Sequence, residues 1–307
     1  MKEYVSAVAV VRSMENLLLT YNDFEQLINA RNQNEFDTLL LSKNNSSLSE
    51  VWEMLKTFAP DSRELEIMLY QNDFSNLKSV LKAMISNKEP DSYFIQPSNI
   101  SLETLKEAFQ TKNSDILPDY MRETAETAYE LLTRTLDGQL TDILIDTATL
   151  MTMQKASKDF GGEFIQKYVQ LITAFADIKV AYRCSKIKVS KDFMESAVCG
   201  SDELDKQSLI RTALAGTDSF IGFLEHTSYI NLAEVLKENP ELFERYCDNL
   251  IMEFAEDAQM KAFGIEPLIA YFIAKETELK NIRIISVCRE MGLEKKQIIE
   301  RLRKSYV

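Results

Sequence analysis

The chain has 307 residues and a formal net charge of −13 at pH 7. Its 8 glycines and 6 prolines are well under half of the roughly 12 per cent that these two residues usually make up. Sandwiches, barrels and doubly wound sheets need many tight turns, so this scarcity excludes them and predicts an all-α fold. The negative charge argues against general binding to nucleic acid or anionic lipid.

The N-terminal segment, MKEYVSAVAVVRSMENLLL, is not expected to be a signal peptide, because Arg12 and Glu15 interrupt its apolar run. The longest uncharged stretch, residues 92–102, contains Pro97 and is much shorter than the roughly 18 residues that a membrane span needs. These features predict a cytosolic protein without direct membrane insertion.

A tripeptide of Asn or Asp, an aliphatic residue, and Lys or Arg occurs three times. The copies are Asn76-Leu77-Lys78, Asp177-Ile178-Lys179 and Asn281-Ile282-Arg283. Their first residues are 101 and 104 positions apart (177 − 76 and 281 − 177). Near-regular recurrence at this distance predicts an internal repeat of about 100 residues.

On a helical wheel the motif separates a core face from an outer face. The Asn or Asp shares the core face with the residues four and seven positions later: Val80 and Ala83, Ala181 and Cys184, Ile285 and Cys288. The Lys or Arg points roughly the opposite way. We expect the Asn or Asp to be hydrogen-bonded to a neighbouring helix end, since an unpaired buried polar group costs about 1–3 kcal/mol.

A short amphipathic helix is predicted after each motif, over residues 100–109, 189–198 and 293–302. Ser101 and Ser190 are suitable N-caps, whereas the third copy has Glu294. The first copy carries about a dozen extra residues, NKEPDSYFIQPSN, that predict a surface loop.

Proline and glycine mark the limits of the last long helix. Pro267 lies near its predicted first turn, and Gly292 is a natural stop at its C-terminal end. We therefore predict three similar helical-bundle subdomains, residues 1–113, 114–220 and 221–307. The last 33 residues carry a local charge of +4, from nine Lys or Arg and five Glu. A basic end on an acidic body suits docking against protein partners, and a solvated amphipathic tail is the alternative.

No constellation of catalytic residues is recognisable. His226 is the only histidine, so histidine-rich metal sites and histidine-based triads are excluded. Neither a Walker-type nor a dinucleotide-binding glycine motif occurs, and Gly161-Gly162 indicates a loop before the next helix. The four cysteines have no paired spacing and predict small buried side chains: Cys184, Cys199, Cys247 and Cys288. We predict a protein that is not an enzyme and has no cofactor, metal or small-molecule ligand.

Residues 264–307 strongly resemble the C-terminus of the C subunits of bacterial V-type and archaeal A-type ATP synthases, which are relatives of the d subunits of eukaryotic vacuolar ATPases. The opening helix, with Arg12 and Glu15, is also similar to that of the family. The middle copy is more divergent, although its length and helical pattern agree. The C-terminal matches are Gly264, Glu266, Pro267, Ala270, Tyr271, Ala274, Lys275, Glu276, Glu278, Lys280, Asn281, Arg283, Glu300, Arg301, Leu302, Arg303 and Tyr306.

The resemblance implies an all-helical, funnel-shaped protein whose three subdomains surround a pseudo-threefold axis. It also implies a non-catalytic central-stalk part of a rotary motor, on the cytoplasmic side of the membrane. Its partners would be the D and F proteins of the central axle and the proteolipid subunits of the rotor ring. Torque passing through it would couple ATP synthesis or hydrolysis to proton or sodium transport. The motif residues are the candidate partner contacts: Asn76, Lys78, Asp177, Lys179, Asn281 and Arg283.

Two other functions fit parts of the sequence. Repeats and acidity also suit a helical-repeat scaffold that binds other proteins and is unrelated to rotary ATPases. Residues 288–304 have the helix–glycine–helix rhythm and local positive charge of a helix-turn-helix DNA-binding protein, which the net charge of −13 opposes.

Overall fold

The computed structural model describes residues 4–43, 46–59, 63–86, 90–187 and 189–307. Every regular element in these ranges is helical and no strand occurs in them, which confirms the predicted all-α class. No helix of these ranges is both long enough and apolar enough to cross a membrane. The chain divides into two compact units, residues 1–62 with 235–307, and residues 63–234. The predicted boundaries at 113 and 220 and the threefold arrangement stay predictions.

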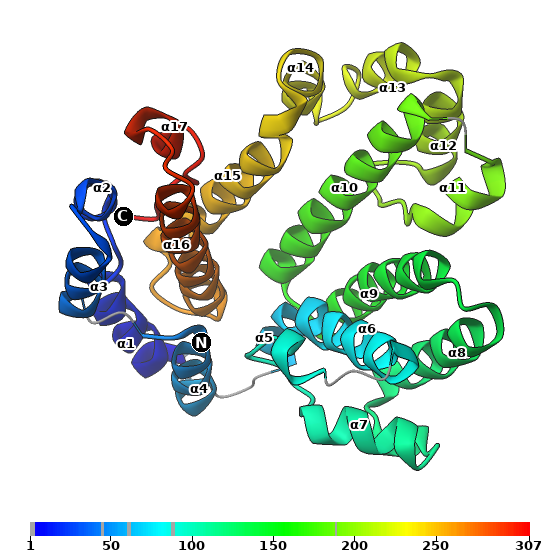
Figure 1. Cartoon of the computed structure of the whole chain (residues 1–307), viewed down its shortest axis with the longest axis horizontal. Helices are drawn as coiled ribbons and strands as arrows, with labels where there is room; N and C mark the ends of the chain where they lie inside the picture. Colours follow the sequence, from blue (N-terminus) through cyan, green and yellow to red (C-terminus); the bar gives the residue numbers. More distant parts are fainter. Residues whose placement is uncertain (1–3, 44–45, 60–62, 87–89, 188) are drawn as a thin grey trace. The chain divides into compact units, whose positions relative to one another are not determined.

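Unit 1 combines helices from both ends of the chain (Figure 1). Its elements are α1 (Val5–Glu15), α2 (Tyr21–Asn29), α3 (Gln33–Ser42), α4 (Leu48–Phe58), η4 (Pro240–Leu242), α15 (Phe243–Glu256), η5 (Asp257–Met260), α16 (Glu266–Glu290) and α17 (Lys295–Ile299). The helix α14 (Ile230–Glu238) contains the boundary between the units.

The long helix α16 is the centre of unit 1 and packs against α1, α2, α4, α15 and α17. Its first half is buried on all sides, with nine consecutive buried residues from 267 to 275, as expected of a helix inside a core. Trp52 on α4 meets Phe272 edge-on, with ring centroids 5.5 Å apart. Further along, one face of α16 is buried in a cluster that includes Ile285, Phe24 and Phe36.

Unit 2 is continuous in sequence. Its elements are α5 (Arg63–Met68), α6 (Tyr70–Ser86), η2 (Asp91–Tyr93), α7 (Leu102–Gln110), η3 (Ser114–Ile116), α8 (Asp119–Thr135), α9 (Gly138–Phe160), α10 (Glu163–Lys186), α11 (Lys191–Ala197), α12 (Lys206–Ala215) and α13 (Thr217–Leu224).

The helix α9 has the central place in unit 2, in contact with α5, α6, α8, α10 and α11. Its ion pairs show that α6 runs antiparallel to it: Lys78 pairs with Asp146, and Lys82 pairs with Asp142. The predicted glycine loop is confirmed, because Gly161 caps the end of α9 and Gly162 precedes α10.

Several predicted helix ends are confirmed. Ser101 and Ser190 are N-caps, each with its hydroxyl accepting a backbone N–H three residues later. Pro267 lies in the first turn of α16, and Gly292 follows the end of that helix with φ of 70°, a conformation that suits glycine.

The last predicted helix is shorter than expected. It covers only Lys295–Ile299 instead of 293–302, and Gln297 accepts the N–H of Glu294 in place of the serine caps of the other copies. Ile298 is buried in the core of unit 1. A helix of five residues is shorter than the recognition helix that the helix-turn-helix alternative requires, so the structure does not support that alternative.

Candidate functional site

The three repeated polar side chains are buried as predicted. Asn76, Asp177 and Asn281 lie on α6, α10 and α16 and expose at most 1% of their surface. The residues four and seven positions later are buried as well: Val80, Ala83, Ala181, Cys184, Ile285 and Cys288. The helical wheel therefore identified the core face of each helix.

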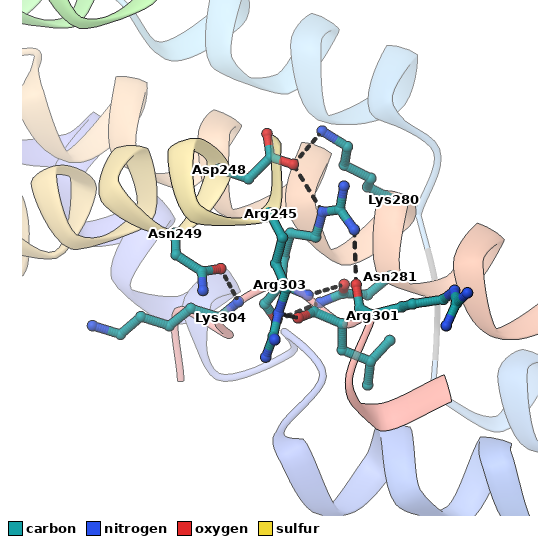
Figure 2. A network of polar contacts seen from close by, with 9 residues as sticks. Arg245, Asp248, Asn249, Lys280, Asn281, Arg301, Arg303 and Lys304 are labelled. Carbon is teal, nitrogen blue, oxygen red and sulfur yellow. Dashed lines mark hydrogen bonds and ion pairs between the residues drawn. The ribbon is translucent and has the colours of Figure 1, made fainter. Parts of the chain in front are cut away.

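Asn281 holds the chain that follows α17. Its Nδ2 donates to the carbonyl of Arg303 at 3.0 Å, and its Oδ1 accepts the N–H of the same residue at 2.8 Å (Figure 2). The side-chain amide is matched donor to acceptor with both the backbone N–H and the backbone carbonyl of one residue. Two hydrogen bonds thus satisfy the polar edge of an otherwise apolar helix face.

Asn76 makes the same pair of hydrogen bonds to Ile95, with 2.7 Å to the N–H and 2.9 Å to the carbonyl. One turn earlier, Asp73 accepts three hydrogen bonds: two from Asn99 and one from the hydroxyl of Tyr120, each at 2.8 Å. Burial nevertheless raises the pKa of Asp73 above its usual value, against the lowering effect of these donors.

Asp177 meets two donors instead of a donor and an acceptor. Its carboxylate accepts the N–H of Cys199 at 2.9 Å and that of Gly200 at 2.7 Å. Gly200 has φ of 79°, and a Cβ there would lie 2.8 Å from the Cβ of Lys206, so glycine is required at this turn. Burial raises the pKa of Asp177 even though both N–H groups favour its charged form.

The predicted partner, a neighbouring helix end, is found in the second copy, where Asp177 bonds Cys199 and Gly200 directly after the C-cap of α11. The third copy needs a correction, because Asn281 bonds Arg303 in the non-helical segment beyond α17. In the first copy the bonded residue, Ile95, lies between η2 and α7. The anchored residue of this copy therefore precedes α7 (Leu102–Gln110), the helix predicted over residues 100–109, instead of following it.

The three cations of the motif differ in their surroundings. Lys78 pairs with Asp146 on α9 at 2.5 Å, Lys179 is half-buried, and Arg283 is exposed as expected. Each motif thus supplies one buried Asn or Asp that holds a backbone segment, and one cation that is less buried. We use the term polar anchor for Asn76, Asp177 or Asn281 together with the backbone that it holds.

Residues 302–304 are fastened further by α15. Arg245 donates to the carbonyl of Leu302 at 2.8 Å, and Asn249 accepts the N–H of Lys304 at 2.8 Å. Asp248 receives both Arg303, at 2.8 Å, and Lys280 of α16, at 2.7 Å. Figure 2 shows these side chains converging on the segment from two helices. The C-terminal segment is therefore bonded at consecutive backbone positions.

The same segment reaches the first helices of unit 1. Ser305 donates to the carbonyl of Leu19 at 3.1 Å, and the hydroxyl of Tyr306 donates to Glu15 at 3.1 Å. Arg12 pairs with Glu15 at 2.6 Å and donates to the carbonyl of Ala258. Burial next to Glu15 raises the pKa of Tyr306. Residues at opposite ends of the sequence are thus joined by polar contacts.

An ion pair inside α16 was not predicted. Lys275 and Glu278 are almost fully buried, with 2.5 Å between Nζ and Oε1, and the other oxygen of Glu278 accepts the N–H of Leu19 at 2.5 Å. A signal was present in the sequence, because positions 275 and 278 continue the stripe of Tyr271 and Ile282 at helical spacing. Burial next to the Glu278 charge raises the pKa of Tyr271 to about 12.

The polar network is suited to holding backbone segments in place rather than to catalysing a reaction. The buried carboxylates Asp73, Asp177 and Glu278 face backbone N–H groups, an amide, a hydroxyl or a cation of their own unit. Within the part of the chain that the structure describes, no group of three or more His, Cys, Asp or Glu side chains could hold a metal ion.

Comparison with known proteins gives a consistent result. Residues 7–301 match the family model described as ATP synthase (C/AC39) subunit. The C subunit of the V-type sodium ATPase of Enterococcus hirae is 26% identical, over 99% of both chains. Two C subunits of A-type ATP synthases are also similar. That of Methanocaldococcus jannaschii is 24% identical over 78% of this chain and 65% of its own, and that of Methanobrevibacter smithii is 22% identical over 97% and 88%.

The family match covers both units and most of the residues on which the resemblance was based, including the side chains of the three polar anchors. The chain therefore belongs to the C subunit family of V-type and A-type ATP synthases.

Proposed function

We propose that this chain is the central-stalk component that joins the axle of a V/A-type rotary ATPase to its membrane rotor ring. In this role it is non-catalytic and peripheral, on the cytoplasmic side of the membrane. It receives the foot of the D and F proteins and rests on the proteolipid ring, so that ATP turnover is coupled to proton or sodium transport. The observation that carries the proposal is the family match along nearly the whole chain.

The construction of unit 1 supports a mechanical role. A part that transmits torque must resist stretching between its points of attachment, and its ends must not fray. The C-terminal segment is hydrogen-bonded to α15, α16 and the α1–α2 connection. These contacts join segments of the chain that are up to 291 positions apart, so a load on either end is shared by the whole unit.

The coupling role can be tested in membrane vesicles that contain the complete ATPase. Vesicles from cells without this chain are expected to lose ATP-driven ion uptake, followed with a fluorescent probe, because the axle no longer turns the ring. Addition of the purified chain should restore uptake. Undiminished uptake without the chain would contradict the proposal.

The cations of the motif are proposed contacts to the ring. Three comparable patches with Lys78, Lys179 and Arg283 would let one protein meet a symmetric ring without any single dominant contact. Reversal of all three charges is expected to release the chain from ring-containing membranes at moderate salt, with helical content unchanged by circular dichroism. Undiminished binding would leave these residues a structural role only.

The family match along residues 7–301 argues against a helical-repeat scaffold unrelated to rotary ATPases, the alternative that the sequence left open. Coexpression separates the two functions: the central-stalk component should copurify with the D and F proteins and the ring, whereas an unrelated scaffold should not.

A further inference from the structure

A groove of about 700 Å³ opens within unit 2, bounded by α6, α9, α10 and α11. The helices α9 and α10 are joined by Gly161 and Gly162 and diverge from that turn (Figure 1). The lining positions on α9 and α10 span residues 139–150 and 176–187. At 1.5 Å per residue each wall is roughly 16 Å long, or about three helical turns.

Both walls present apolar side chains at helical spacing. Ile143 and Leu150 line the α9 wall, with the polar Thr147 between them, and Val180 and the C-cap residue Ile187 line the α10 wall. Ile187 stands at the rim with 63% of its surface exposed. Two facing stripes of this kind suit the apolar face of an amphipathic helix, which binds through residues one turn apart.

The charged group of the groove that is free to bind a partner is positive. Its carboxylates already have partners, since Asp146 pairs with Lys78 and Asp177 accepts two backbone N–H groups. Arg183 lines the groove, is exposed, and has no hydrogen bond or ion pair with any residue that the structure describes. An exposed guanidinium next to apolar walls is suited to bind a carboxylate.

The sequence around Arg183 is also rich in positive charge. Between Asp177 and Asp192 there are five Lys or Arg residues and no Asp or Glu, although the whole chain has a net charge of −13. Lys186, one turn beyond Arg183, packs its ammonium over the ring of Tyr182 at 4.2 Å. The sequence at this end of α10 is therefore locally basic in an acidic protein, which favours an acidic partner.

We propose that the groove binds an amphipathic α-helix of a protein partner, with its apolar face between α9 and α10 and an acidic residue paired with Arg183. The length of the walls fits about three turns of such a helix. The inference rests on the proposed function in one respect only, because it assumes that the chain works within a multisubunit assembly. It names one segment, one groove and one charge pair, and it shares only Lys179 with the proposed ring contacts.

Site-specific photocrosslinking tests the groove. Ile187 is replaced by p-benzoylphenylalanine in the full chain, which is then incorporated into ATPase-containing membranes and irradiated. The adduct is mapped by mass spectrometry. We expect one adduct, with a helical segment of another protein of the assembly that has an Asp or Glu within one turn of the crosslinked position. The same probe at Leu214, an exposed residue of α12 away from the groove, should not label that segment.

A matched pair of charge reversals isolates the role of Arg183. Arg183→Glu should lower the yield of the adduct at least about tenfold, since a close charge pair is worth more than 1.4 kcal/mol. Arg211→Glu changes an equally exposed arginine on α12 and should leave the yield unchanged. Circular dichroism of both variants shows whether the fold is retained.

Several outcomes would overturn the inference. They are an adduct with a second copy of this chain, an adduct with a basic or non-helical segment, equal yields in the two arginine variants, and no adduct from a chain that stays in the assembly. Copurification of the other ATPase subunits is measured in the same samples and tests the proposed function separately. If the other ATPase subunits do not copurify, the proposed function is wrong. The adduct of the chain with the protein that it does bind then still shows whether the groove binds an amphipathic helix.

Discussion

Asn281, the polar anchor of unit 1, and Asp177, the second anchor of unit 2, each hold a backbone segment, but with different side chains. Asn281 faces one N–H and one carbonyl of Arg303, whereas Asp177 faces the N–H groups of two consecutive residues. The turn at Gly200 aims the second N–H at Asp177. An amide suits the first arrangement and a carboxylate the second, so the backbone decides which residue is required.

The two anchors also differ in what they hold. Asp177 holds a turn between α11 and α12, whereas Asn281 holds Arg303, which follows the last helix of unit 1. Residues 293–307 can therefore be deleted without removing a connection between two helices of unit 1. The predictions below use these differences, from the largest expected effect to the smallest.

Deletion of residues 293–307 should remove the anchored segment of unit 1. Ile298, Leu302 and Tyr306 are buried there, and each contributes roughly 1.5–3 kcal/mol. The free energy of unfolding should fall by about 5 kcal/mol or more, seen as a clear drop in melting temperature by circular dichroism. An unchanged melting curve would show that the segment is an independent tail.

Replacement of Lys275 by Met should also destabilise unit 1 strongly. It leaves Glu278 buried without its cation, which typically costs about 3–5 kcal/mol. Lys280→Met is a matched control on the same helix, because Lys280 is half exposed in its pair with Asp248 and should matter by about 0–1 kcal/mol. Urea unfolding measures both. Equal effects would mean that the buried pair is dispensable.

Exchange of the anchor side chains tests the donor–acceptor rule directly. Asp177→Asn turns an amide donor toward a backbone donor, and Asn281→Asp turns a carboxylate toward a carbonyl. Each should lower the free energy of unfolding by about 1–3 kcal/mol, measured in urea at pH 7. If either exchange is neutral, the backbone does not dictate the side chain at that position.

The pH dependence of Asn281→Asp sharpens the same comparison. Burial against a carbonyl should raise the pKa of the introduced carboxyl in the folded state. The folded variant then binds a proton more tightly than the unfolded chain, so its stability is lost as pH rises above the unfolded pKa of about 3.9. Relative to wild type, the variant should be more destabilised at pH 7 than at pH 4.5. Asp177→Asn removes a carboxyl whose pKa burial raises, so the opposite trend is expected: relative to wild type, it should be less destabilised at pH 7 than at pH 4.5.

The smallest effect is expected for Lys78→Gln. The partner of Lys78, Asp146, is largely exposed, so water screens the pair and its loss should cost about 0–1 kcal/mol. A loss above about 2 kcal/mol in urea unfolding, beyond the range of an exposed pair, would show that this pair helps to hold α6 on α9.

Local features were predictable from the sequence. The scarcity of glycine and proline predicted the all-α class, and helical spacing predicted which residues follow Asn76, Asp177 and Asn281 into the core. These predictions need only the period of a helix. The serine caps and Gly292 follow from the chemistry of helix ends.

Contacts between distant residues were not predictable. No periodicity specifies that Asn281 meets Arg303, or that Ser305 meets Leu19, because these pairs depend on how helices pack. Asn and Asp were treated as equivalent in the motif, since the difference between them lies in the backbone that they face. The helical wheel places Lys275 and Glu278 on the buried face of their helix. Their residue types, however, are the same as those of an exposed ion pair, so the burial of the pair was not predicted.

The composition of unit 1 from both ends of the chain has a consequence for synthesis. A ribosome makes α1 to α4 first, but their packing partner α16 follows about two hundred residues later. Unit 2 is continuous and can fold in the meantime, as domains do during translation. The apolar faces of the first helices must wait, and closing so long a loop carries its entropic cost. We expect the nascent first helices to be the part of this protein most in need of a chaperone.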